Sequence, residues 1–307
     1  MKALSNNLNN VSMFSILDFN EKIFPNIISP LKEMIAYEAI WDMTEKASFK
    51  KIFETFKSNK FALPSLIVTN EVIDNYHEKL KELIEDKNDA FEVIVNHTFN
   101  YPEKLRDAQE PVEVLYYKGN LELLKEKSVA VVGSRNISEE GKKRTKKLVK
   151  GLVENGYTIA SGLAKGVDTY AHLSAIYYGG KTFAVIGTPI NMYYPKENKS
   201  LQDHIAKKYL LISQVPIIKY SKQGIKGNRL FFPERNKTMS ALTDATIIVE
   251  ASDTSGSLTQ ARAAFAQGRK LFILDSCFEN KDITWPAKFE KQGAIRVKVI
   301  SDILNNL

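Results

Sequence analysis

The sequence has one cysteine, Cys277, in 307 residues. A disulfide within the chain is therefore excluded, as is a zinc site made of several cysteines. The N-terminus opens onto polar asparagines rather than the apolar segment of a secretory signal. Apolar runs such as 245–249 end long before the ~20 residues that cross a bilayer. We expect a soluble protein of a reducing cytoplasm, with no contact to a membrane.

Several catalytic motifs are missing as well. The chain has no Gly-x-Ser-x-Gly elbow, no His-Glu-x-x-His, no clustered His/Asp metal pattern and no obvious carboxylate pair. We therefore expect a binding protein rather than an enzyme, with no metal and no cofactor.

What is present is ordinary globular composition, with 44% hydrophobic and 26% charged residues. Collagen-like and low-complexity chains are excluded, and the length favours two units. The net charge of +7 is uneven: residues 1–100 hold 11 Lys/Arg against 15 Asp/Glu, a net of −4, whereas residues 101–307 hold 32 against 21, a net of +11. The basic part favours nucleic acid or phosphorylated ligands.

Hydrophobic spacing divides the chain near residue 100. Apolar residues recur every three or four positions in 31–60 and 71–86, which predicts a small helical N-terminal unit over 1–99. The proline-containing segment 100–111 is the candidate boundary. Short apolar runs then alternate with helical patterns, the runs being 129–132, 157–160, 182–186, 210–212, 245–249 and 271–274, and the helices 138–155, 167–178 and 256–267. This alternation predicts an α/β fold over 100–307, an extended Rossmann-like, doubly wound and mostly parallel sheet.

Ligands of such sheets bind at the carboxyl ends of the strands. The first loop there begins Gly133-Ser134-Arg135 and ends at Ser138, which can cap the next helix. Gly133 would let a ligand approach the backbone, free amides would attract an anion, and Arg135 offers a planar fork for phosphate oxygens. A tight turn with an exposed arginine is an equal alternative, since neither a dinucleotide motif nor a Walker loop is present.

The second loop carries two glycines around a lysine. Gly162 and Gly166 suit a bend that presents Lys165 as a point charge above the edge of the sheet. We interpret Asp168 as a first-turn helix residue rather than a base, and His172 as a structural histidine rather than a ligand.

A third group, Phe231-Phe232 followed by Arg235-Asn236-Lys237, comes after a polar and basic stretch interpreted as a long exposed loop. Aromatic and cationic residues together suit the stacking and phosphate contacts of single-stranded nucleic acid. At least one of the two phenylalanines is expected instead to anchor the loop in the core.

The fourth loop is rich in small hydroxyl residues. Ser255, Gly256 and Ser257, with Ser252 and Thr254, form an anion-receptive cluster at the start of a helix. Helix capping would explain one serine but not the cluster.

The densest basic run lies on the helix 138–155 and consists of Lys142, Lys143, Arg144, Lys146, Lys147 and Lys150. These cations share the helix with an apolar stripe. A solvated face is the simpler interpretation; a route for a nucleic-acid strand outside the main groove is the alternative.

At these loops the sequence resembles the DprA/Smf family of DNA-processing proteins, over about residues 100–307. The resemblance rests on the ordered series 129–135, 161–168 with Ala171-His172, Tyr194-Pro195 with Asn198, 232–236, and Glu250-Ala251 with 255–258. Residues 117–120 resemble the family's lead-in strand, and 302–304 its closing element.

The resemblance implies a homodimeric single-stranded DNA-binding protein that protects strands and helps load the recombinase RecA in transformation or recombination. It also implies that Arg135, Lys165 and Arg235 contact phosphates. Lys237 stands where the family often has a second arginine. Because the sequence stops at Leu307, we expect no winged-helix unit of the kind found in many relatives, and the N-terminal segment matches the family's usual leading domain poorly.

Two other functions remain open. The same loops could hold a mononucleotide, as in a Rossmann-type sensor or nucleoside-phosphate hydrolase, although 253–257 lacks the proline and paired glycines of the lysine-decarboxylase-like group. Alternatively, the helical N-terminal unit could be the working part of an interaction protein.

Overall fold

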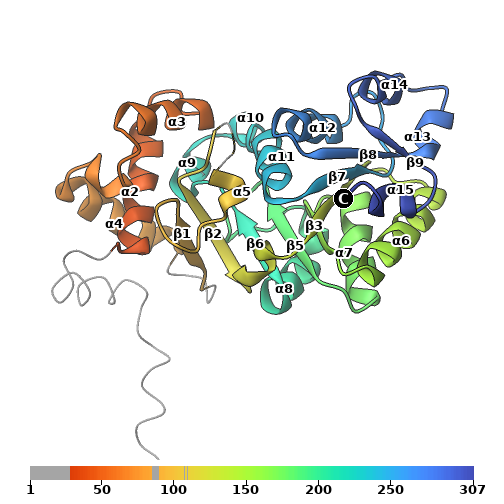
Figure 1. Ribbon diagram of the computed structural model, residues 1–307. Helices are drawn as coiled ribbons and strands as arrows, with labels where there is room; N and C mark the ends of the chain where they lie inside the picture. The colour runs from red at the N-terminus through yellow and green to blue at the C-terminus, as the bar shows by residue number, and fades with distance from the viewer. Residues whose placement is uncertain (1–27, 85–89, 107, 109) are drawn as a thin grey trace, which may run out of the picture.

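One mixed sheet runs through the computed structural model, which describes residues 28–84, 90–106, 108 and 110–307 (Figure 1). Within these residues the strand order is β1-β2-β6-β5-β4-β3-β7-β8-β9. The strands are β1 Glu92–Val95, β2 Val114–Gly119, β3 Ser128–Val132, β4 Thr158–Ser161, β5 Thr182–Ile186, β6 Leu210–Ser213, β7 Ala245–Ile248, β8 Lys270–Leu274 and β9 Ile295–Val297. From β6 to β9 all neighbours pair in parallel, while β1 and β2 are antiparallel additions.

The strand order reverses at β3, which has β4 on one side and β7 on the other. Connections that leave in opposite directions open a crevice at the carboxyl ends of the two central strands. The predicted Rossmann-like, mostly parallel sheet is confirmed, and its switch point lies between the loops after β3 and β7.

Helices cover both faces of the sheet (Figure 1). On one face, α6 Glu139–Glu154, α7 Val167–Tyr177 and α15 Ser301–Leu304 cover a core that includes alternate residues of β3, such as Val129 and Val131. On the other face lie α11 Phe231–Leu242 and α12 Ser257–Ala266, with Ala130 and Val132 beneath them. The remaining helices are α2 Pro30–Met43, α3 Phe49–Ser58, α4 Asn70–Ile84, α5 Glu103–Arg106, α8 Lys199–Lys208, α9 Ile217–Lys222, α10 Ile225–Asn228, α13 Asp275–Glu279 and α14 Trp285–Glu290, with short 3-10 turns at 64–66, 121–125 and 196–198.

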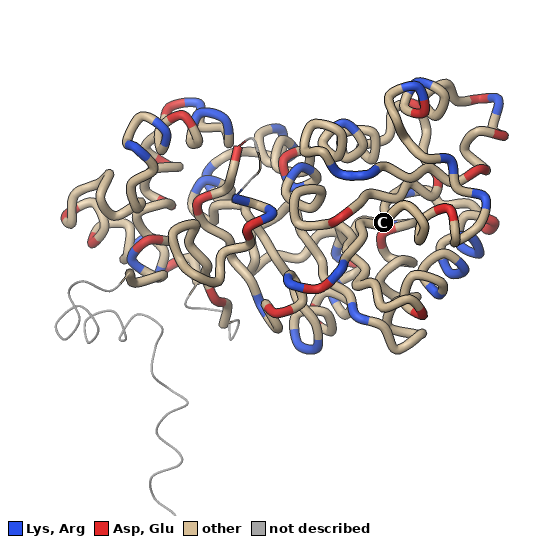
Figure 2. Tube along the Cα trace, viewed as in Figure 1, with Lys and Arg blue, Asp and Glu red and all other residues tan. Residues whose placement is uncertain are grey.

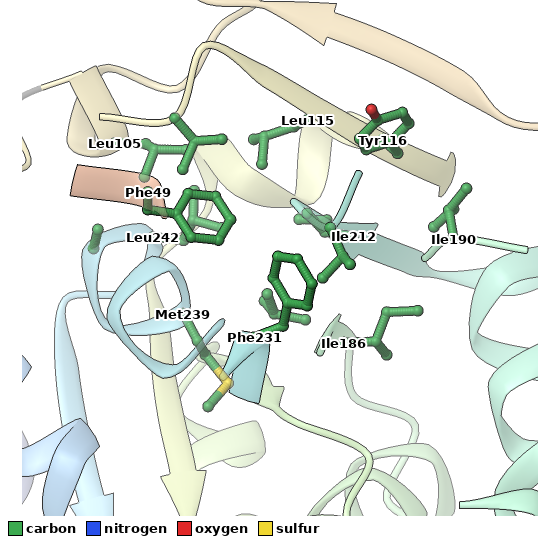
Figure 3. Packing of buried hydrophobic residues seen from close by; sticks show 14 of the residues in the cluster. Phe49, Leu105, Leu115, Tyr116, Ile186, Ile190, Ile212, Phe231, Met239 and Leu242 are labelled. Atoms are coloured by element: carbon green, nitrogen blue, oxygen red, sulfur yellow. The ribbon is translucent and has the colours of Figure 1, made fainter. Parts of the chain in front are cut away.

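The N-terminal helices pack against the sheet. Helix α2 is buried almost all round, because it lies between α4, α9 and β1. Phe231 of α11 joins the two parts, because the centre of its ring lies 6.0 Å from the ring centres of both Trp41 and Phe49. Figure 3 shows the rings of Phe49 and Phe231 close to each other. A buried carboxylate adds a polar link: Glu38 accepts hydrogen bonds from Tyr116 Oη at 2.6 Å and from two amides at the start of α9 at 2.7 and 2.9 Å.

The segment expected to separate two units also packs closely. Strand β1 belongs to the sheet although it precedes residue 100, and Tyr101 and Leu105 are buried. This packing does not mark a boundary, and the division of the chain into two domains, 1–99 and 100–307, stays a prediction. The predicted helices 31–60 and 71–86 correspond to α2, α3 and α4, with residues 85 and 86 outside the described part of the chain. No described helix is both long and apolar enough to cross a membrane.

The prediction of a long exposed loop before residue 231 was wrong. The chain forms α9 and α10 there, and Phe231 begins α11. Pro233 occupies the first turn of α11, where its missing N–H has no intrahelical partner to lose. The helix was missed because its buried side includes Arg235, Thr238 and Ser240, so hydrophobic periodicity does not reveal it.

Candidate functional site

Three loops meet at the switch point of the sheet. The Ser134 amide donates to the Glu250 carbonyl at 2.6 Å, and the Val167 amide donates to the Ser134 carbonyl at 3.1 Å. The Ser257 hydroxyl donates to the Gly133 carbonyl at 3.0 Å. The loops that follow β3, β4 and β7 are thereby held together as one unit.

Two glycines allow this close approach. A Cβ at Gly133 would lie 2.6 Å from Val167 Cγ2, and one at Gly166 would lie 2.2 Å from the Ser134 carbonyl oxygen. Gly166 also has a φ of +78°, a conformation that other residues rarely adopt. Gly133 was expected to make room for a ligand. In the structure the atoms that occupy this space belong to the protein, and the glycine serves loop packing.

The N-terminus of α6 already holds an anion, the Glu250 side chain. Its carboxylate accepts from the Ser138 amide at 3.1 Å and from the Ser138 hydroxyl at 2.6 Å. Ser138 caps the helix as predicted, accepting from the Gly141 amide at 2.9 Å. The Glu250 carboxylate thus lies at the positive end of the helix, and the Ser138 and Gly141 amides, which were expected to be free for a ligand anion, have partners within the protein.

Arg235 differs most from its expected environment. Only 5% of its surface is exposed, and its Nη1 donates to the carbonyls of Gly162 and Val185 at 2.6 and 2.7 Å. Burial lowers the pKa of this guanidinium to about 10, against the attraction of Asp168, so it stays charged at neutral pH. Arg235 is therefore a buried cation that ties α11 to the ends of β4 and β5.

Gly162 and Asp168 complete this buried polar cluster. A Cβ at Gly162 would lie 2.4 Å from Arg235 Nη1, so the guanidinium packs on bare backbone. Asp168 lies in the first turn of α7, as expected, and its Oδ2 accepts from the amides of Gly162 and Ala164 at 3.1 and 3.4 Å. Burial raises the pKa of Asp168, while Arg235 and the amide donors act in the opposite direction.

Arg135 and Arg235 line a single pocket of about 450 Å³. Arg135 is exposed, and among the described residues its side chain forms no hydrogen bond or ion pair. It is close enough to Arg235 that its charge helps lower the pKa of that group. The other predicted site residues that line this pocket are Gly133, Ser134, Asn236, Ser255, Gly256 and Ser257. Asp168 also lines the pocket, and two arginines against this carboxylate leave the lining positively charged, which suits an anion.

Four predicted residues do not line this pocket. Gly162 and Gly166 lie behind it in the packing described above. Lys165 is exposed and donates to Glu197 at 2.6 Å, while Lys237 donates to Glu234 at 2.9 Å and faces a neighbouring pocket. Both lysines would have to leave these carboxylates to contact a phosphate.

The hydroxyl cluster is partly used by the protein itself. Ser255 Oγ donates to Ser257 Oγ at 3.1 Å, and Asn236 Nδ2 donates to the Gly256 carbonyl at 3.1 Å. Among the residues that the structure describes, no side chain caps α12. Its N-terminal residues line the pocket without an internal anion of the kind found at α6.

Sequence reasoning missed Gln260. Its side chain is fully buried on α12 and lines the pocket, and its Oε1 has no hydrogen-bond partner within the described part of the chain. In the sequence it is one polar residue in a helix, without a motif.

His172 agrees with its interpretation as structural: Nδ1 is 2.7 Å from Thr182 Oγ1, and burial lowers the pKa of the imidazole to about 3. Among the described residues no group of three or more His, Cys, Asp or Glu could hold a metal ion.

Comparison with known proteins now places the chain in a family. Residues 92–307 match the family model described as DNA recombination-mediator protein A. The chain belongs to this family. The predicted DprA/Smf resemblance is therefore confirmed.

Named relatives agree. DNA processing protein DprA of Bacillus subtilis is 32% identical over 78% of this chain and 78% of its own length. The DprA of Streptococcus pneumoniae is 44% identical over 57% of this chain, and the match spans 59% of that protein. The crystal structure of DprA from S. pneumoniae superposes with a TM-score of 0.67 at 29% identity, covering 97% of this chain and 98% of that one. DNA processing protein A from Helicobacter pylori, whose structure was described for its single-stranded DNA binding mode, gives a TM-score of 0.60 at 29% identity over 71% of this chain and 96% of that chain.

Proposed function

We propose that this protein binds single-stranded DNA, without cleaving it, in the pocket at the switch point of the sheet. The observation that carries the proposal is the pair Arg135 and Arg235, one exposed and one buried, on the wall of a single pocket. Arg135 would contact a phosphate directly. Arg235 would add positive potential from beneath while holding the pocket walls in place.

The composition of the pocket supports a flexible nucleic acid. Phe232 lines it and packs 5.3 Å from the ring of Tyr194, which offers an aromatic surface beside the cations. Single strands use this combination of stacking and phosphate contact. The H. pylori relative named above is described for single-stranded DNA binding, which supports the same ligand class here.

Further properties follow from the family and are proposed with the main function. We propose that the protein works as a homodimer in the cytoplasm and protects bound strands. We also propose that it passes them to the recombinase RecA. Size-exclusion chromatography with light scattering tests the dimer. Pull-down of purified RecA in the presence of oligonucleotide tests the partner.

The main test is a titration of labelled oligonucleotides, followed by fluorescence anisotropy at two salt concentrations. One phosphate-facing cation, Arg135, predicts a slope of log K against log salt near −0.7 for a short single strand, at about −0.7 per contact. Arg135→Ala should weaken binding about fivefold near 0.1 M salt, with little dependence on base sequence.

Lys208→Ala is the matched control, because this exposed lysine ends α8, whose C-terminal end leads into the start of β6 at the opposite edge of the sheet. A slope near zero, or equal losses in both variants, would refute the pocket as the site. Duplex DNA, RNA and nucleoside monophosphates, run in parallel, separate the proposal from the mononucleotide enzyme. Released base would favour the enzyme.

A further inference from the structure

A strip of lysines and tyrosines leads away from the pocket along α6 and α7. Three lysines of α6 lie over tyrosines of α7 or of the residue that follows it. Lys142 is 5.4 Å from the ring centre of Tyr170, Lys146 is 4.6 Å from that of Tyr177, and Lys150 is 5.8 Å from that of Tyr178, the C-cap of α7. We call these six residues the Lys–Tyr strip. Neither its lysines nor its tyrosines line the pocket described above.

The strip is continuous with the pocket at one end. Helix α6 begins directly after the loop that carries Arg135, and α7 begins at the Gly166 turn that packs on that loop. Lys142, Lys146 and Lys150 are spaced by four residues, so successive ammonium groups start about 6 Å apart along the helix. The two helices pack against each other along their length, as the lower right of Figure 1 shows.

Exposed aromatic surface accompanies the charge. Tyr177 is 72% exposed and Leu173, one turn before it, is 47% exposed. The surface of α6 carries six cations against three carboxylates, and Figure 2 shows this concentration of Lys and Arg. The acidic partners lie at the helix ends: Glu139 pairs with Lys142, and Glu154 lies 3.7 Å from Lys150. Lys146, in the middle, forms no ion pair among the described residues and rests on Tyr177.

We propose that the Lys–Tyr strip is a second contact surface for single-stranded nucleic acid, which receives the strand as it leaves the pocket. The inference rests on the proposed function. A polyanion with exposed bases is the ligand that uses both the positive charge of the lysines and the exposed ring of Tyr177. Its phosphates contact the lysines, and its bases stack on Tyr177. A protein partner of acidic charge would use the lysines but not the exposed ring in this way.

The experiment compares strand lengths. An oligothymidylate of about six nucleotides fills the pocket, and one of about twenty nucleotides also reaches the strip. The wild-type salt slope should steepen by about 1.4 from the short to the long strand, from two further contacts. K146Q/K150Q should remove this difference and weaken long-strand binding about 25-fold near 0.1 M salt, while short-strand binding is unchanged.

K143Q/K147Q is the matched control, since it removes the same charge from the same helix at lysines that do not lie over the tyrosines. Y177A should weaken long-strand binding by about fivefold or more, because stacking is worth about 1–3 kcal/mol per base. Y177F should retain the affinity. Thermal melting checks that each variant is folded.

The outcomes separate the two proposals. If the wild type binds neither strand, the proposed function fails. If it binds both but K146Q/K150Q is unchanged, or loses no more than K143Q/K147Q, the strip is refuted and the pocket stands. If the strip variants change the oligomeric mass and leave long-strand affinity unaltered, the strip is an interface between copies of this chain, and the proposal is overturned.

Discussion

Replacing Arg135 and Arg235 separately by alanine should give opposite results, although both residues are arginines of the same pocket. Arg135 is exposed and unpaired among the described residues, so its loss should affect ligand binding alone. Arg235 is 5% exposed and bonded to two backbone carbonyls. Its loss should first affect the stability of the fold.

The size of the effect follows from the bonds that Arg235 makes. Each hydrogen bond from a charged donor contributes about 1.5–3 kcal/mol, so removing the two bonds to Gly162 and Val185 should cost about 3–6 kcal/mol. The free energy of unfolding should fall by this amount because the carbonyls of Gly162 and Val185 would stay buried without the donor that Arg235 supplies. Asp168 would also lose the positive charge that opposes the rise of its pKa. For Arg135→Ala we expect a free energy of unfolding close to that of the wild type.

Urea denaturation of both variants, followed by circular dichroism, measures these differences. Arg235→Ala should also lower the melting temperature by about 10 °C. Arg235→Lys is the informative second variant, since it keeps the charge but cannot place donors as the planar fork does, and should recover only part of the stability. An Arg235→Ala protein as stable as the wild type that had lost only DNA binding would refute the assignment of Arg235 as a buried structural cation.

Three further predictions concern backbone and buried titratable groups. Gly166→Ala should be clearly less stable than Gly156→Ala: both positions have a φ of +78°, but a Cβ meets the Ser134 carbonyl only at Gly166, and equal melting temperatures would contradict this. Burial lowers the pKa of His172 from 6.5 to about 3 in the folded protein. Its contribution to the free energy of unfolding is therefore complete above pH 6.5. That contribution is lost as the pH falls towards 3, at up to about 1.4 kcal/mol per pH unit. His172→Gln should therefore show a shallower loss of stability between pH 6.5 and 4 in urea titrations, and an unchanged profile would argue against a buried neutral imidazole. Burial raises the pKa of Glu38 from 4.5 to about 7, so its pH dependence runs the other way: its contribution to the free energy of unfolding declines as the pH rises from 4.5 to 7. Glu38→Gln should flatten that decline in stability. A steeper decline in the variant would refute the reasoning.

The central sheet could be predicted because strands buried on both faces are continuous apolar runs. All six predicted strands, from β3 to β8, are present within a residue or so of their expected ends. Helix α11 could not be found in the same way, because its buried side includes Arg235, Thr238 and Ser240. Strand β1 was missed too, since it lies at the edge of the sheet and is only partly buried.

The candidate site was predictable in part for a related reason. Parallel strands bring the loops at their carboxyl ends to one edge, so local sequence placed Ser134, Arg135 and the serines near 255 together. Local sequence gave no sign that Glu250 would occupy the start of α6. It also could not show that Gln260 would line the same pocket, because a buried amide in a helix belongs to no motif.

By itself, the sequence determined the wound sheet, the loops that carry chemistry and the family. These depend on residue type and on spacing within short segments. Which arginine is exposed in the pocket and which one is buried beneath it depends on the folded chain. The carbonyls that bury Arg235 lie 73 and 50 residues away along the chain, and whether a charge is exposed or enclosed depends on such distant neighbours rather than on its own motif.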